Sequence, residues 1–341
     1  MGGSGQNTII LNMINSIKKS KLLNIALIFF LMVVIAVFTS KNFLTKFNIQ
    51  SVVRDLAFVS IIAIGQSCLL LLGELDLSVG KMSSLSGVLS GLMMVNAGIP
   101  PAIAFGACLI LGACFGFING TIITKLRLNA MVVTIGMQGV YGGVNLVITK
   151  GKAIVGIPEG IQFLGKGNLF GVPMPFVLTI IVLILVLFLT QRTTFGRYIY
   201  AIGNNRGAVN MLGINVDSVR VLVYALVGML SALVGVLMVA RLGASQPSIG
   251  DSWVMNSIAA SVIGGVALTG GIGSPAGALL GAAIISIIQN MIVLYGVNIY
   301  WQTAVSGVVV VLAISFDSIG SIIGARQKRH KALSWKQEGV K

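Results

Sequence analysis

The chain has 341 residues, of which 56% are hydrophobic and only 9% are charged, and its mean hydropathy is +0.99. A soluble protein of this length needs a charged surface, which 23 Lys and Arg together with 8 Asp and Glu cannot cover. The composition therefore excludes a soluble globular protein and predicts an all-α chain that crosses a lipid bilayer several times.

Side chains that carry chemistry are scarce. Cys68, Cys108 and Cys114 lie in apolar runs without C-x-x-C spacing, and His330 is the single histidine. These residues predict neither a disulfide framework nor a zinc site, and they leave no Ser/His/Asp set. We therefore expect no enzyme activity, no metal and no cofactor.

Ten segments are apolar enough to cross the membrane, given that a span needs about 20 residues to cross about 30 Å of hydrocarbon. The third and the eighth are short and interrupted by glycine. The predicted spans are 22–39, 55–73, 82–96, 102–124, 131–149, 175–191, 220–240, 254–270, 276–295 and 300–319. The chain then divides into a terminal segment 1–21, a membrane domain 22–320 with a long polar loop 192–219, and a basic tail 321–341.

The distribution of Lys and Arg predicts the orientation of these spans. If the N-terminus is cytoplasmic, 16 of the 23 basic residues fall on the cytoplasmic side and seven on the other. Cytoplasmic loops carry such an excess, so both termini and the loop 192–219 are predicted to be cytoplasmic. The net charge of +15 is then a topology signal and does not predict nucleic-acid binding.

The two halves of the chain resemble each other weakly. Residues 76–80 (DLSVG) are matched 170 residues later by 246–250 (QPSIG), and a glycine stripe with a spacing of four follows each segment. With five spans in each half, the halves have opposite orientations, so the pattern suggests an inverted repeat in which the fourth span corresponds to the ninth. Small residues at this spacing favour close helix packing. The stripes are Gly112, Gly116 and Gly120 in the first half, and Gly273, Gly277 and Gly281 in the second.

Two acidic residues lie between apolar runs in the segment 73–80. Glu74 and Asp76 are costly in a membrane and must face protein, water or a partner. Two interpretations remain open. Asp76 and Ser78 can cap the next helix from a cytoplasmic turn, or the segment through Gly80 can form a broken helix that enters the transport path.

The polar loop 192–219 contains a candidate docking element. Ala208, Met211 and Leu212 recur at helical spacing and predict a short amphipathic helix outside the membrane. That helix either lies on the lipid surface or docks into a cytoplasmic partner. No G-x-x-x-x-G-K-[ST] motif occurs in the sequence, so a pump built on this chain needs its ATPase on another polypeptide.

Three ordered motifs resemble a known family. The runs 76–80 (DLSVG), 194–216 (TFGRY through GINV) and 258–274 (IAA through GG to GGIGS) are similar in order and spacing to permeases of the ribose, galactose and xylose type of bacterial ABC importer. The resemblance extends over about residues 30–320. It is far more specific than any one of the motifs alone.

The resemblance implies a ten-span, sugar-transporting subunit in the bacterial inner membrane. It implies three kinds of protein partner: ABC ATPase subunits, an extracytoplasmic solute-binding protein, and a second permease subunit in a homodimer or heterodimer. It also implies a coupling helix that docks into the ATPase, formed here by Asn204, Asn205, Arg206, Ala208, Met211, Leu212 and Gly213.

The chain departs from the family pattern at two places. Relatives commonly carry Glu-Ala-Ala where this chain has Arg206-Gly207-Ala208, and they often carry glycine at the position of Glu74. An alternative function, an ion- or proton-coupled secondary carrier, would use Glu74 and Asp76 as coupling groups. It is disfavoured because an acidic pair without a basic partner in the membrane makes a poor relay.

Overall fold

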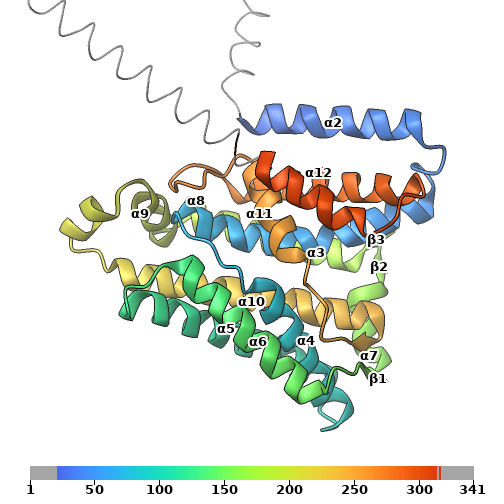
Figure 1. Cartoon of the computed structure of the whole chain (residues 1–341), viewed down its shortest axis with the longest axis horizontal. Coiled ribbons are helices and arrows are strands. Elements are labelled where there is room, and N and C mark those ends of the chain that lie inside the picture. The colour runs from blue at the N-terminus through green and yellow to red at the C-terminus, as the bar shows by residue number, and fades with distance from the viewer. Residues whose placement is uncertain (1–20, 313–314, 316–341) are drawn as a thin grey trace, which may run out of the picture.

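The structure is a computed structural model that describes residues 21–312 and residue 315 (Figure 1). The described chain is almost entirely helical, which confirms the all-α prediction. Residues 1–20 of the predicted segment 1–21, the whole predicted tail 321–341 and the end of the tenth predicted span lie outside the described residues. The helices are α2 (Lys21–Thr39), α3 (Lys46–Leu71), α4 (Val79–Val95), α5 (Pro101–Lys125), α6 (Ala130–Thr149), α7 (Glu159–Lys166), α8 (Met174–Arg192), α9 (Thr194–Met211), α10 (Val216–Leu242), α11 (Trp253–Ile263), α12 (Pro275–Leu294) and an unlabelled helix Trp301–Leu312.

Within the described residues, seven helices are long and apolar enough to span a membrane, and three shorter apolar helices accompany them. The short ones include α4 and α11, which are the third and eighth predicted spans. The predicted eighth span extends to residue 270, but α11 ends at Ile263 because Gly265 and Gly270 take positive φ angles. Each of the ten predicted spans therefore corresponds to an apolar helix, most of them with shifted ends.

Two small antiparallel strand pairs lie at one end of the bundle. β1 (Ile154–Val155) pairs antiparallel with β4 (Ala244–Ser245), and β2 (Asn168–Leu169) pairs antiparallel with β3 (Val172–Pro173). The short helix α7 lies beside them, while α9 projects from the opposite end (Figure 1). We call these the α7 end and the α9 end. None of the elements between residues 150 and 174 was predicted from the sequence, where this segment is a loop between two spans.

The two halves of the bundle pack in the same way. In the first half α4 and α5 contact α10, and in the second half α11 and α12 contact α3. Contacts between α4 and α5 have their counterpart between α11 and α12, and α3 contacts α10. The last two helices of each trio thus pack on the first helix of the other trio. An inverted repeat predicts these contacts when α3, α4 and α5 correspond to α10, α11 and α12.

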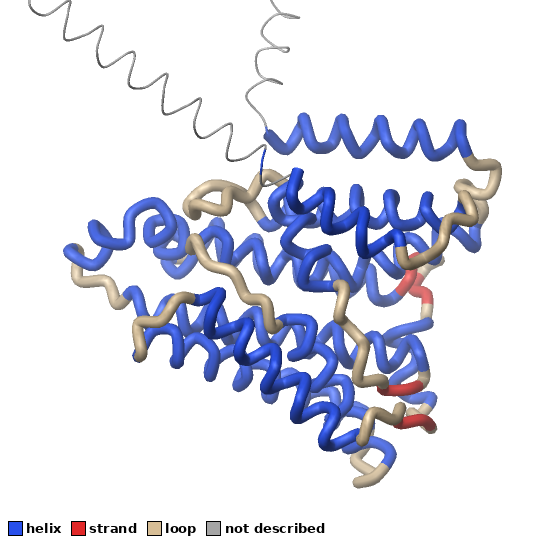
Figure 2. Tube along the Cα trace, in the orientation of Figure 1, coloured by secondary structure: helices blue, strands red, loops and turns tan. Residues whose placement is uncertain are grey.

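Both halves contain a loop that runs through the body of the bundle, drawn in tan in Figure 2. The first is 72–78, between α3 and α4, and the second is 246–252, between β4 and α11. Each loop leads into one of the two short helices. α4 and α11 therefore start inside the bundle. The candidate site lies where the start of α4 meets the loop 246–252.

Glycines hold the central helices close together. A Cβ at Gly116 would overlap the backbone of Tyr224 in α10, and one at Gly228 would overlap that of Gly112 in α5. A Cβ at Gly281 of α12 would likewise overlap the backbone of Ala260 in α11. Small residues at these crossings allow the close backbone approach that stabilises helix pairs in lipid.

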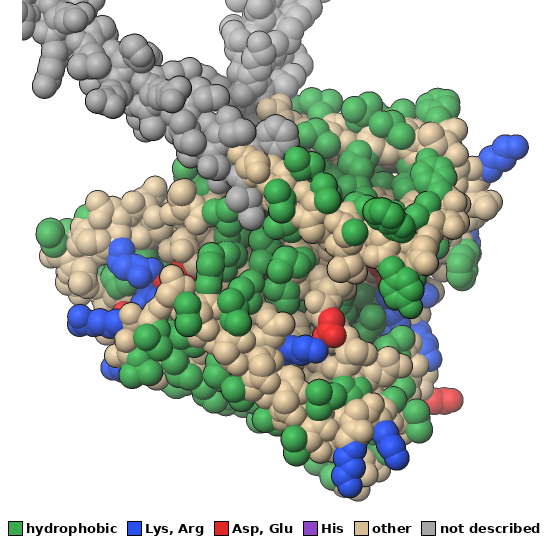
Figure 3. Space-filling model, viewed as in Figure 1, with side chains coloured by type: hydrophobic (Ala, Val, Ile, Leu, Met, Phe, Trp, Pro, Cys, Tyr) green, Lys and Arg blue, Asp and Glu red, His purple; other side chains and the backbone are tan. Residues whose placement is uncertain are grey.

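Charged side chains gather at the two ends of the bundle on the face shown in Figure 3, and hydrophobic side chains cover much of the surface between them. A blue and red patch interrupts this apolar middle. Fully exposed charges at this depth would be costly in lipid. The patch therefore marks a surface that faces something other than hydrocarbon.

Candidate functional site

The start of α4 meets the internal loop 246–252 at a pair of glycines. Gly80, at the start of α4, lies so close to Gly250 that a Cβ on Gly80 would overlap the Gly250 carbonyl oxygen. The next residue on each side forms an ion pair, in which Lys81 Nζ lies 2.6 Å from Asp251 Oδ1. The Lys81 stem packs against Gly142, near the middle of α6, which places the ion pair near the middle of the bundle. The two segments that the repeat pattern singled out are thus in contact.

This ion pair is accessible. The side chain of Asp251 is 54% exposed and that of Lys81 is 25% exposed. A charge pair at this depth is costly against lipid, and such residues face a bundle interior or a water-filled cavity. The sequence counts Lys81 among the basic residues on the cytoplasmic side and does not identify Asp251 as a site residue. Their pairing could not be predicted, because it depends on the approach of two segments 170 residues apart in the chain.

Asp76 is fully buried and hydrogen-bonded. Its Oδ1 accepts bonds from the Ser78 backbone N–H at 2.7 Å and from the Ser78 hydroxyl at 2.6 Å. Asn119 of α5 donates to Asp76 Oδ2 at 3.3 Å and to Ser78 Oγ at 2.9 Å, and Tyr141 of α6 donates to Asn119 at 2.8 Å. These bonds favour a structural role for Asp76 at the start of α4. Asn119 and Tyr141 were not identified from the sequence, because their position in apolar runs gives no signal.

Glu74 joins two arginines from different elements. Its Oε1 accepts a bond from Arg206 of α9 and one from Arg220 of α10, both at 2.6 Å. Glu74 and Arg220 are each only 7% exposed, whereas Arg206 is half-exposed. Asp217, one turn before Arg220 in α10, lies 3.6 Å from it. We call Glu74, Arg206 and Arg220 the Glu74 cluster; it connects the internal loop 72–78 to α9.

The tip of α9 is a separate short helical segment. Asn205 breaks the helix with φ −157° and ψ 92°, and its side chain caps the tip by accepting a bond from the Ala208 N–H at 3.0 Å. The segment ends at Leu212, after which Gly213 takes a positive φ of 75°. Met211 and Leu212 are largely exposed, and Ala208 is exposed beside them. The predicted helix therefore exists as the end of a longer α9, which begins at Thr194 and was not predicted.

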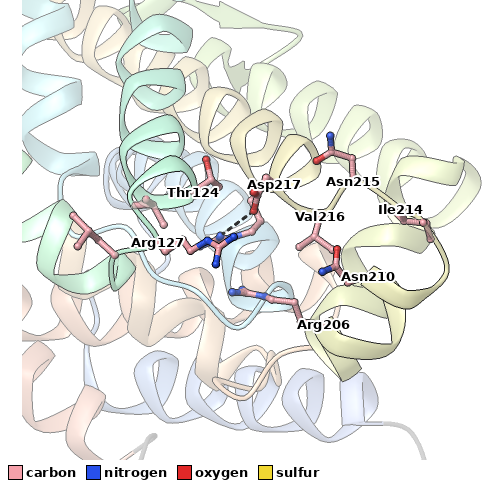
Figure 4. Close-up of a pocket in the computed structure, with 12 residues that line it drawn as sticks. Thr124, Arg127, Arg206, Asn210, Ile214, Asn215, Val216 and Asp217 are labelled. Atoms are coloured by element: carbon pink, nitrogen blue, oxygen red, sulfur yellow. Dashed lines mark ion pairs between the residues drawn. The ribbon is translucent and has the colours of Figure 1, made fainter.

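A cavity of about 600 Å³ lies between this tip and the start of α10. Arg206 and Asn210 reach toward it from α9, and Asp217 lies opposite on α10 (Figure 4). Arg127, which follows α5, also lines it. The cavity lies where α5 and α9 end and α10 begins, so it belongs to the surface of the α9 end.

Five of the six glycines in the two predicted stripes lie against another helix or the segment that follows it. Gly112, Gly116 and Gly120 face α10, and Gly277 and Gly281 face α11 or the glycines that follow it. Gly273 lies before α12 with φ 133° and contacts Val266, so it belongs to a loop. Among the described residues, no group of three or more His, Cys, Asp or Glu is placed to hold a metal ion.

Comparison with known proteins gives a consistent result. Residues 48–314 match the family model of the permease component of branched-chain amino acid transport systems. The ribose import permease of Bacillus subtilis (strain 168) is 37% identical over 84% of this chain and 90% of its own length, and that of Escherichia coli (strain K12) is 36% identical over 84% and 91%. The autoinducer 2 import system permease of Escherichia coli O9:H4 (strain HS) is 32% identical over 89% of each chain. No solved structure matches the chain.

Proposed function

Because this chain belongs to the family of bacterial ABC importer permeases, we propose that it forms the pathway by which a sugar or similar small polar solute crosses the inner membrane. The observation that supports this most strongly is the 37% identity to a ribose import permease over 90% of that protein. The helices that would span the membrane agree with it.

We propose that the α9 end faces the cytoplasm. Arg192, Arg197, Arg206 and Arg220 lie in or beside α9, and the excess of basic residues on that side persists when Lys81 is set aside. An introduced cysteine at Glu159, on α7, should then react with a membrane-impermeant reagent in intact cells. One at Arg206 should not. The reverse pattern of labelling would show that the orientation is inverted.

The chain works with other subunits in this proposal. ATP hydrolysis takes place in separate ATPase subunits, because the sequence contains no P-loop. An extracytoplasmic binding protein delivers the solute to the α7 end. The exposed pair of Lys81 and Asp251 near the middle of the bundle supports a second permease subunit, since this face must be covered by protein or water.

We propose that the tip of α9 is the coupling helix. Its exposed Ala208, Met211 and Leu212 form an apolar face that suits a groove on the ATPase. Asn204 and Asn205 precede the tip and Gly213 ends it. Arg206 connects the tip to Glu74, so a displacement of the tip would be transmitted to the loop 72–78.

Gating is the role that we propose for the segment from Glu74 to Gly80. Asp76 and Ser78 hold the start of α4 through hydrogen bonds, and Gly80 contacts Gly250 of the other half. The segment would thus act through its position between the two halves. The expectation that the acidic pair lacks a basic partner is wrong, because Glu74 is paired with two arginines. The ion-coupled alternative is not favoured, since the relatives are ribose import permeases.

Uptake by cells that express the chain with its ATPase and binding protein tests the proposed function. Such cells should accumulate a radiolabelled monosaccharide from a panel of pentoses and hexoses. Cells that lack only this chain should not. Equal uptake of every sugar in both strains would refute the proposal.

A further inference from the structure

The structure contains a large cavity that the transport motifs do not identify. Its volume is about 1,000 Å³, at the upper end of the range of about 300–1,000 Å³ that small-molecule sites occupy. It is lined by α3, by the loop 246–252 with the first turn of α11, by α12 and by the helix Trp301–Leu312. It reaches from Asn42 and Tyr300, near the α7 end, to Asp251 near the middle of the bundle.

Two buried polar side chains line this cavity without a partner. Asn256 of α11 is 2% exposed and its Oδ1 accepts no hydrogen bond from the described residues. Ser286 of α12 is 4% exposed and its hydroxyl is likewise unpaired there. A buried polar group without a hydrogen bond loses the bonds that it makes to water and gains none in return. Two such groups on one cavity indicate that a polar ligand or water satisfies them.

The polar part of the lining carries no free charge. Asp55 is paired with Arg241, and Asp251 is paired with Lys81, so both carboxylates among the lining residues are already neutralised. Side-chain amides and hydroxyls supply the remaining polar atoms, among them the Gln289 amide, which donates to the Ser306 hydroxyl at 3.4 Å. An uncharged ligand with many hydrogen-bonding groups fits this lining better than an ion does.

Aromatic rings form part of the wall. Phe58 of α3 and Trp253 of α11 are stacked with ring centroids 6.3 Å apart and planes 9° from parallel, and both line the cavity. Apolar and aromatic walls with a few placed polar groups are typical of small-molecule sites. α11 also begins here, so the N-terminal turn of this short helix forms part of the cavity wall.

We propose that this cavity is the solute site of the permease, which takes a neutral, polyhydroxylated molecule and contacts it through Asn256 and Ser286. This rests on the proposed function and names the residues that carry it. The cavity extends to the α7 end, where the binding protein releases the solute in the proposed function, and it reaches Asp251, where the two halves of the repeat meet.

Cysteine modification tests this site in cells that express the whole transporter. Cys68, Cys108 and Cys114 are first replaced, and the background is kept if its expression and its uptake of D-ribose and other monosaccharides match those of wild type. Asn256→Cys and Ser286→Cys should then react with the impermeant reagent MTSET. Their modification should lower uptake by at least about tenfold, and dithiothreitol should restore it. Ser86→Cys is the matched control, because Ser86 is equally buried and unpaired but lies outside the cavity lining.

Phe170→Cys, at an almost fully exposed position, reports that the reagent works. Failure of both cavity cysteines to react while Phe170→Cys reacts would overturn the proposal, as would modification without loss of uptake. Reaction of Ser86→Cys at the same rate as Ser286→Cys would also overturn it. Failure of the proposed function has a different signature, since the wild-type transporter would then take up no monosaccharide at all. That result would overturn the ligand class, and labelling of Asn256→Cys would still report a water-filled cavity.

Discussion

Removal of the Glu74 carboxylate should destabilise the permease strongly. Glu74 and Arg220 are each 7% exposed and their charged atoms lie 2.6 Å apart, so Glu74→Gln leaves a buried guanidinium without its anion. Breaking a buried ion pair from one side costs about 3–5 kcal/mol. Asp217, 3.6 Å from Arg220, retains part of the compensation, so we expect a loss at the lower end, about 3 kcal/mol.

Two control variants separate this effect from a general loss of charge. Arg206 binds the same carboxylate but is half-exposed, and Arg206→Ala should cost about 0–1 kcal/mol because solvent screens such pairs. Asp217→Asn changes an exposed partner of Arg220 and should cost less than about 1 kcal/mol. In the double variant Glu74→Leu with Arg220→Met, no buried charge is left unpaired, so it should be more stable than Glu74→Gln.

The measurement is unfolding of the detergent-solubilised protein by increasing SDS, followed by circular dichroism. The midpoint for Glu74→Gln should fall well below those of wild type and Arg206→Ala. A midpoint for Glu74→Gln within about 1 kcal/mol of wild type would refute the view that this buried pair holds the loop 72–78 to α10.

Three other substitutions test separate parts of the account. Leu212→Asp places a charge on the exposed apolar face of the α9 tip. The variant permease should insert normally into the membrane yet fail to retain the ATPase during purification. Normal copurification and normal uptake would contradict the coupling role. Gly116→Ala should lower the free energy of unfolding by about 1–3 kcal/mol, because its Cβ meets the Tyr224 backbone. Gly106→Ala in the same helix is the control, since its Cβ meets nothing within 4 Å and the change should be neutral or stabilising. Equal SDS midpoints for the two variants would disprove the packing argument. Asp76→Asn keeps an acceptor for the Ser78 N–H, but its new amide N–H either faces the Asn119 amide donor or makes no bond. The free energy of unfolding should therefore fall by about 1–3 kcal/mol, while uptake per folded molecule persists. Loss of uptake at unchanged stability would instead place Asp76 in the transport path.

The helices could be predicted because lipid imposes a simple rule on sequence. A span must be apolar over its length, so α5, α8 and α12 stand out from composition alone. The short spans α4 and α11 were also found, with their glycine interruptions. The ends were less accurate, since α3 begins at Lys46, nine residues before the predicted 55–73, where Thr45 caps the helix. A polar first turn gives no hydropathy signal.

The candidate site was only partly predictable, because its contacts join distant parts of the chain. Glu74 could be singled out as an acidic residue among apolar ones, but its partner Arg220 lies 146 residues away. Asn256 and Ser286 look like ordinary polar residues in apolar helices until the fold shows the cavity that they line. The helix at the α9 tip could be predicted because its signal, the spacing of Ala208, Met211 and Leu212, lies within a few consecutive residues.

The central claim is that ATP hydrolysis in partner subunits drives a sugar through this chain. It is tested most directly by uptake of radiolabelled D-ribose, or of the panel sugar that the cells accumulate, into liposomes that contain the permease with its ATPase. We expect accumulation only with ATP on the ATPase side and sugar-loaded binding protein on the other, and we expect no effect of a proton ionophore. Uptake by the permease alone, without ATP and abolished by the ionophore, would contradict the account.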